Sequence, residues 1–360
     1  MSDMCVSVLA CSAVLWGTSA PAMRYLFLQG EGQAPTPSVV AAVQTTAAAL
    51  CLVLIDFISK QSRQQNSPAI TATTDDSTAQ HDPEAAAEAA APAVEPSSSA
   101  WPVNLFLTAT ACSVAFAGFE IGLWAFIANC STITGFENTT TSRGTFLIRL
   151  SAMFTPVVAS LAGERFPLPV WLGCFAAFSG GVLISADSSS SQAAGSSFLS
   201  LSSGDLFIIF AAFMWSVQTV SVGRHAPNFA PTTLAKFQLA TMSLLSASWL
   251  AFDAIRHVQG GAQSAELHSL WGGGSHLLNW GVMLIPAIGP WSVGTALQAK
   301  GQSQVPSAVA MIILASDPLW AILFAGLVGG NEQHLGSLGW VGAAGILSAS
   351  VIASAGRKND

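Results

Sequence analysis

The sequence predicts an all-α, polytopic membrane protein with about ten transmembrane helices. Only 9% of its 360 residues are charged and 51% are hydrophobic, whereas a soluble globular domain carries about 25% charged residues. The mean hydropathy is +0.55. The apolar residues also gather in runs of about 20, the length that crosses a hydrocarbon core of roughly 30 Å. With so few charges, a soluble fold of this size could not cover its surface.

The first half of the chain contains five predicted helices, each an apolar run of about membrane-spanning length. Their ranges are 4–28, 38–58, 103–130, 144–162 and 169–186. A polar segment, 60–100, separates the second helix from the third. It is rich in Ala, Ser, Thr, Pro and acidic residues and has almost no large apolar ones. Such a segment cannot offset its ordering entropy, so it is predicted to be a disordered linker.

A second set of five predicted helices follows a Ser-rich linker at 187–204. Their ranges are 205–225, 231–253, 277–300, 306–328 and 335–355. The chain therefore divides into a first unit at 1–186 and a second at 205–356. Five helices in each unit imply that the second enters the membrane in the opposite direction to the first, as in the inverted repeats of many secondary transporters.

Short signals within the two units also indicate duplication. Each unit opens with a Trp that is followed eight or nine residues later by an Arg, Trp16 with Arg24 and Trp215 with Arg224. Each predicted fourth helix contains a proline and is followed by a Gly and a Glu. These matches favour two inverted five-helix repeats.

The distribution of basic residues predicts the orientation. If the N-terminus is cytoplasmic, seven Lys and Arg residues near helix ends face the cytoplasm and three face the opposite side. The seven are Lys60, Arg63, Arg165, Arg224, Lys300, Arg357 and Lys358, and the three are Arg24, Arg143 and Arg256. Because positive charges concentrate on the cytoplasmic side, both termini are predicted to be cytoplasmic. A plasma membrane, a plastid envelope and an endomembrane all remain open, as does a targeting leader missing from this sequence.

Three stretches of the sequence resemble the EamA family of the drug/metabolite transporter superfamily. They read LWGTSAPAMRYL from residue 15, GLWAFIANCSTITGFENTTTSRGTFLIRLSAMFTPVVASLAGERFPLPVWLGCFAAFSGGVLIS from residue 122, and SAVAMIILASDPLWAILFAGLVGGNEQHLGSLGWVGAAGILSAS from residue 307. The resemblance implies ten helices in two inverted repeats, cytoplasmic termini, and export or exchange of small metabolites. Two features depart from the family pattern, a longer linker at 60–100 and Asp317 where the family often has Glu before proline.

Arg149 and Glu120 are the first candidates for a transport site, because an ionisable group at bilayer depth costs roughly 2.5–3.5 kcal/mol and needs a reason to be there. Arg149 lies seven residues before Pro156, and its guanidinium could bind a carboxylate or phosphate. Glu120 lies midway along the predicted third helix, where a desolvated carboxyl suits proton coupling. A structural ion pair between Arg149 and Glu120 is the alternative for both.

Asp317 and Lys236 are further candidates. Asp317 precedes Pro318, and helices broken by proline are where transporters build binding sites. The alternative for Asp317 is a hydrogen bond to the backbone that the proline loosens. Lys236 lies five residues after Pro231, close enough to the helix end to snorkel to the membrane surface.

Uncharged polar side chains and tryptophans could complete a polar cavity, although a Trp in a membrane helix more often packs or anchors at the interface. The candidates are Trp16, Trp124, Asn129, Gln218 and Gln238. Small residues at four-residue spacing in two helices, at Gly173, Ala177 and Gly181 and at Gly339 and Ala343, would permit close helix contact within the fold or in a homodimer.

The function predicted is secondary transport of a small polar metabolite, anionic or zwitterionic, with protons as the coupling ion and no cofactor. No phosphate-binding Gly-x-x-x-x-Gly-Lys loop is present, the six cysteines have no metal-ligand spacing, and no basic stripe suggests nucleic acid. No protease motif argues for an enzyme. Two alternatives stay open: an exporter of neutral or cationic amphiphiles recognised by Glu120 and tryptophans, and a scaffold or receptor of transporter descent that moves no solute.

Overall fold

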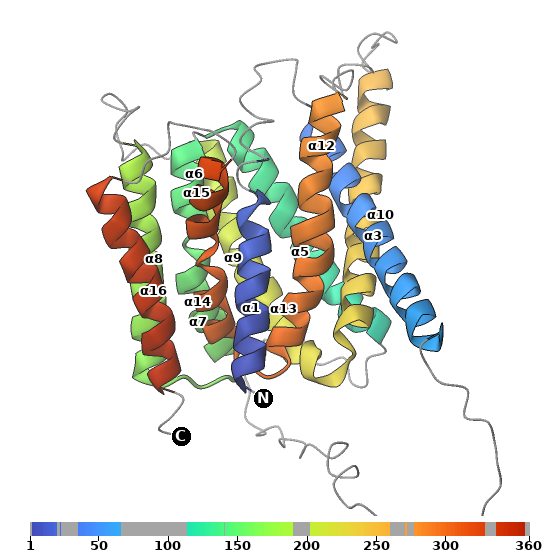
Figure 1. Ribbon diagram of the computed structural model, residues 1–360. Helices are drawn as coiled ribbons and strands as arrows, with labels where there is room; N and C mark the ends of the chain where they lie inside the picture. Colours follow the sequence, from blue (N-terminus) through green and yellow to red (C-terminus); the bar gives the residue numbers. More distant parts are fainter. Residues whose placement is uncertain are drawn as a thin grey trace, which may run out of the picture.

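The computed structural model describes residues 2–19, 22, 35–65, 114–139, 141–189, 202–259, 271, 277–327 and 336–356. Within these ranges the chain is helical and contains no strand. The helices stand side by side in one bundle (Figure 1). The protein is therefore an all-α protein, as the sequence predicts.

The first half of the bundle contains a helix in each of the five predicted ranges. They are α1 (Ser2–Gly17), α3 (Pro37–Gln65), α5 (Val114–Glu137), the consecutive α6 (Thr141–Ile148) and α7 (Ser151–Leu161), and α8 (Leu168–Ser189).

The second half likewise has helix in each predicted range. They are α9 (Ser203–His225) with the 3₁₀ turn η2 (Ala226–Asn228), α10 (Pro231–Gln259), the continuous run α12 (Leu277–Pro286), η3 (Ala287–Gly294) and α13 (Thr295–Gln302), the consecutive α14 (Ser307–Leu314) and α15 (Asp317–Leu327), and α16 (Ser337–Gly356). Here η3 is a π-helix.

Five helical runs among the described residues are long and apolar enough to cross a membrane, which supports an all-α membrane protein. They are Pro37–Ser62, Val114–Glu137, Arg143–Leu161, Ser203–Asn228 and Asn279–Gln302. Shorter apolar helices lie at Met4–Gly17, Leu168–Ile184, Ser307–Ala321 and Ser337–Ala349.

Several helix ends differ from the predicted ranges. α1 ends at Gly17, where the hydroxyl of Thr18 donates to the carbonyl of Leu15 at 2.7 Å. Most of the predicted range beyond it, up to residue 28, lies outside the described residues. α3 continues to Gln65, so the first residues of the predicted disordered linker are helical, and an ion pair between Lys60 and Asp56 supports this extension. The rest of that linker, residues 66–100, and most of the Ser-rich linker lie outside the described residues.

The predicted fourth helix of each half is interrupted. Between α6 and α7 the amides of Arg149 and Leu150 bond to carbonyls three residues back instead of four. Between α14 and α15 the amide of Ser316 does the same. Pro318 then falls in the first turn of α15, where the missing N–H costs least.

Close helix contacts in this fold are made at glycines. α8 and α16 pack against each other extensively, and a Cβ added at Gly180 would lie 2.5 Å from the carbonyl oxygen of Gly342. The small residues predicted to allow close packing, at Gly181 and Ala343, are thus each one position away from the glycines in contact. Small residues of α8 and α16 allow these two helices to pack closely within the fold. Gly118 and Gly122 of α5 approach α10 in the same way.

Candidate functional site

A cavity of about 300 Å³ lies between the two halves of the bundle. Its wall includes side chains of both interrupted helices and of α1, α3, α5, α9 and η3. Five of the nine residues singled out from the sequence line it: Trp16, Asn129, Arg149, Gln218 and Asp317. A volume of this size matches the lower range of small-molecule sites.

An ion pair joins the two helix breaks at the cavity wall. Nη1 of Arg149, in the break after α6, lies 2.5 Å from Oδ1 of Asp317, the first residue of α15. The two side chains are 19% and 28% exposed. The negative charge of Asp317 at a helix N-terminus is also favoured by the helix dipole. The cavity therefore presents one cation and one anion side by side.

The partners of these charges differ from the two alternatives considered from the sequence. Arg149 pairs with Asp317 and not with Glu120, because the interrupted helices bring residues 168 positions apart into contact. Asp317 accepts a hydrogen bond from the side chain of Arg149. The alternative considered from the sequence was a hydrogen bond between Asp317 and the backbone that Pro318 loosens. A pairing between the two halves needs the tertiary arrangement, which spacing along one helix does not provide.

Three tryptophans form an aromatic wall of the same cavity. The ring centroid of Trp16 lies 5.0 Å from that of Trp291 and 6.4 Å from that of Trp215. Both contacts are edge-to-face, a favourable arrangement for aromatic pairs. The indole of Trp215 also donates to the hydroxyl of Thr132 at 3.1 Å. Trp291 lies in the π-helix η3, and π-helical turns are frequent at functional sites.

Uncharged donors complete the lining. Asn129 is only 6% exposed, and its Nδ2 has no hydrogen-bond partner among the described residues. The hydroxyl of Ser19, another lining residue, also lacks one within the same ranges. Because buried polar groups usually have partners, these two groups are available to a polar ligand.

Four residues singled out from the sequence lie outside the cavity wall: Glu120, Trp124, Lys236 and Gln238. Lys236 makes an ion pair with Asp56 of α3 at 2.7 Å, so its ammonium is held by a partner within the bundle. Gln238 is buried at the contact of α10 with Gly122. The indole nitrogen of Trp124 is buried without a partner in the described part of the chain.

Glu120 forms a pair of its own with His225, the last residue of α9. The histidine Nε2 lies 2.9 Å from Oε2 of Glu120, and Ser221 donates to Oε1 at 3.3 Å. Each of the two ionisable residues is 9% exposed. Sequence reasoning missed His225 because it considered only charges in the middle of apolar runs.

Other lining residues were missed although the sequence carried a usable signal. Gln44 and Gln298 line the cavity and interrupt apolar runs in the same way as Gln218 does, so the same criterion would have found them. Trp215 was noted only as a mark of duplication. Trp291 carries no signal that separates it from a packing residue.

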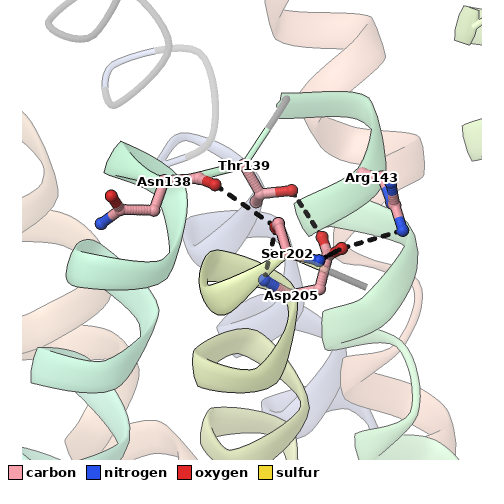
Figure 2. A network of polar contacts seen from close by, with 5 residues as sticks. All are labelled: Asn138, Thr139, Arg143, Ser202 and Asp205. Carbon is pink, nitrogen blue, oxygen red and sulfur yellow. Dashed lines mark hydrogen bonds and ion pairs between the residues drawn. The ribbon is translucent and has the colours of Figure 1, made fainter. Parts of the chain in front are cut away.

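A second inter-half network lies where α5 ends and α9 begins (Figure 2). Asp205 is fully buried and accepts from Arg143 at 2.8 Å, from the hydroxyl of Thr139 at 2.6 Å and from the amide of Ser202 at 2.8 Å. Ser202 and Asp205 also form a capping box on α9. The network fixes the start of α9 against α6 and the end of α5.

The same fold occurs in a solved structure. A chain described only as "Crystal structure of protein" is 15% identical to this one, with a TM-score of 0.62, over 99% of this chain and 98% of its own length. At that identity the likeness shows the fold alone. No protein-family model matches the sequence, and no curated protein matches it.

Within the described residues, no group of three His, Cys, Asp or Glu side chains could hold a metal ion. The chemistry available in the cavity is that of charge pairing, hydrogen bonding and aromatic contact. These are the means by which a small polar molecule is bound.

Proposed function

We propose that the protein is a secondary transporter of the drug/metabolite superfamily type that carries a small zwitterionic solute through the cavity between its halves. The observation that carries the proposal is the Arg149–Asp317 ion pair in the cavity wall, at two facing helix breaks. Discontinuous helices whose ends point at a central site are how many secondary transporters bind their substrates.

The packing of the helices supports two inverted repeats of five. We number the ten main helical runs of the described residues in chain order. The contact of the first run with the eighth, α1 on α13, then corresponds to the contact of the sixth run with the third, α9 on α5. Likewise α7 packs on α9 while α15 packs on α1, and α8 and α16 pack on each other. Figure 1 is consistent with inversion, because α1 begins and α16 ends at the same end of the bundle. We propose that this terminal end faces the cytoplasm.

The pair of opposite charges favours a zwitterion over a simple anion. An anion that binds Arg149 would leave Asp317 without its partner in a partly desolvated wall, which is costly. A solute carrying both a carboxylate and an ammonium can replace both halves of the ion pair at once. Asn129 and the tryptophans would then contact the rest of the solute.

A cationic amphiphile is the second candidate. The three-tryptophan wall next to a carboxylate favours it, because indole faces attract cations. Such a solute would need Asp317 and Trp291 and would gain nothing from Arg149. The two candidates therefore differ in their dependence on the arginine.

The test is uptake by proteoliposomes of a pooled mixture, read by mass spectrometry. Amino acids, organic acids, nucleotides, sugar phosphates and organic cations enter the pool. We expect a zwitterion to accumulate with wild type, and Arg149→Ala and Asp317→Asn each to abolish uptake from folded protein. A double variant that exchanges the two charges, with an acidic residue at Arg149 and a basic residue at Asp317, should recover part of the uptake.

The matched control is Lys236→Met, which removes a cation from an ion pair with an aspartate outside the cavity and should leave uptake in place. Full uptake by Arg149→Ala would refute the binding role of the arginine, and selective loss in Asp317→Asn would favour the amphiphile. If folded wild type moves no solute in the pool, a scaffold without transport becomes the better reading.

A further inference from the structure

The Glu120–His225 pair is buried, polar and separate from the cavity. Both oxygens of the Glu120 carboxylate have donors, His225 at 2.9 Å and Ser221 at 3.3 Å. Neither Glu120 nor His225 lines the cavity. A structural role alone would be met by uncharged residues, which cost less to bury.

The pair lies at the terminal end of the bundle. His225 is followed directly by η2 and by α10, which begins at this end, and α13 ends here as well (Figure 1). Glu120 lies in the second turn of the described part of α5. The pair thus ties the end of α9 to α5 on the side of the bundle that bears the termini.

A chain of hydrogen bonds occupies the space between the cavity and this end. Gln298, a cavity residue, donates to Gln302 at 3.0 Å, and Gln302 donates to the carbonyl of Thr219 in α9 at 2.9 Å. A Cβ added at Gly223 would lie 2.3 Å from the hydroxyl of Ser307, so α9 packs tightly on the start of α14. The last two turns of α9 therefore connect the cavity wall to the Glu120–His225 pair.

The other charges near the pair have partners of their own or are exposed. On α9, Arg224 acts on Glu164, which in turn accepts hydrogen bonds from Ser307. On α10, Lys236 is held by Asp56 of α3, which also binds Lys60. On α13, Lys300 is exposed. A proton bound by the Glu120–His225 pair would change its net charge from negative to neutral.

We propose that Glu120 and His225 form the proton-binding site of the transporter and that a bound proton holds its terminal end closed. With the proton, the pair is an ion pair joining α5 to α9. Without it, a buried carboxylate faces only neutral donors, which favours exposure of the site to water and separation of α9 from Gln302 and from the start of α14. The inference rests on the proposed transport function, but its first test does not require transport.

That first test is hydrogen exchange of residues 298–307 in purified protein, corrected for the intrinsic effect of pH. We expect protection to fall between about pH 5.5 and about pH 8 in wild type and this difference to be lost in Glu120→Gln and His225→Asn. Equal pH dependence in wild type and both variants would overturn the proposal. Matched controls are Glu137→Gln, at the exposed end of the same helix α5, and His257→Gln, exposed on α10.

A transport assay separates this proposal from the previous one. Solute exchange without a pH gradient tests transport, and accumulation driven by the gradient tests coupling. We expect Glu120→Gln and His225→Asn to keep exchange and to lose gradient-driven accumulation down to the level without a gradient. Gradient-driven accumulation that survives in both variants would overturn the proton site while leaving the transporter intact.

Discussion

Gly181 lies directly against the side chain of Arg149. A Cβ at this position would lie 3.0 Å from Cγ and 3.2 Å from Cδ of the arginine. The arginine can move, since it is a flexible side chain, but movement would shift its guanidinium relative to Asp317. The geometry of the charge pair therefore depends on a residue that does not itself line the cavity.

We expect Gly181→Ala to weaken solute binding several-fold with little loss of stability, because displacement of a binding group by even a small distance is costly. Binding to purified protein by calorimetry and thermal unfolding would give the two quantities. Gly281→Ala is the control, since a Cβ there meets nothing within 4 Å. Unchanged affinity in Gly181→Ala would mean that the arginine tolerates displacement.

For single residues, the sequence identified the charged side chains that line the cavity but not the ion pair that they form. Arg149 and Asp317 were singled out because charges are expensive at bilayer depth, and both line the cavity. Their mutual pairing could not be predicted, because it depends on how two distant helix breaks face each other. The same holds for Glu120 and His225, which are 105 residues apart in the sequence.

The contact between α8 and α16 brings the backbones of two helices together at glycines on both sides. A Cβ at Gly342 would lie 2.5 Å from the carbonyl oxygen of Gly180 and 2.9 Å from Cγ1 of Ile184. The first of these is a backbone atom, so the helices themselves would have to separate. Because these glycines have no side chains, α8 and α16, the last helices of the two halves, can lie this close together.

We expect Gly342→Val to destabilise the folded protein by about 1–3 kcal/mol, the usual cost of overpacking. The measurement is the midpoint of thermal unfolding in detergent. Gly281→Val, in open space, is the matched control. A midpoint equal to wild type would indicate that α16 can shift away from α8 freely.

Element positions were predictable from the length of apolar runs, since each predicted range contains helix. A break next to Pro318 was expected from that proline, but the break at 149–150 was not. A proline in the sequence marked each fourth helix, but the breaks fall at 149–150 and 315–316, seven and three residues before the prolines. The break at 315–316 lies within the four residues before Pro318 that a proline disturbs, whereas the break at 149–150 lies too far before Pro156 for that proline to place it.

Across the whole molecule, Glu164 connects the two halves near the terminal end. It follows α7 and accepts from the hydroxyl of Ser307 at 2.9 Å and from its amide at 3.4 Å, at the start of α14. Burial raises the pKa of its carboxyl above the ordinary value of 4.5, against the lowering effects of Ser307 and of the positive charge of Arg224. Glu164 thus supplies an acceptor for a helix N-terminus from the other half.

We expect the pH dependence of stability to change in Glu164→Gln. Because the folded protein holds this proton more tightly than the unfolded chain, the stabilisation is present below about pH 4.5 and is lost as the pH rises through the raised pKa. The variant should therefore lose less stability than wild type over that window, measured by thermal unfolding in detergent. Identical pH profiles would show that the residue does not titrate in this range.

The aromatic wall gives the molecule an optical property. Indoles at 5.0 to 6.4 Å, as in Trp16, Trp215 and Trp291, couple their electronic transitions and produce paired bands of opposite sign in circular dichroism. These bands depend on the angles between the rings, so a solute that tilts one ring changes their amplitude. The protein therefore carries an unlabelled spectroscopic reporter of cavity occupancy. Trp291→Phe should weaken the response to the solute, because only the Trp16–Trp215 pair then remains, and Trp271→Phe, at a stacked pair that does not line the cavity, should leave that response unchanged.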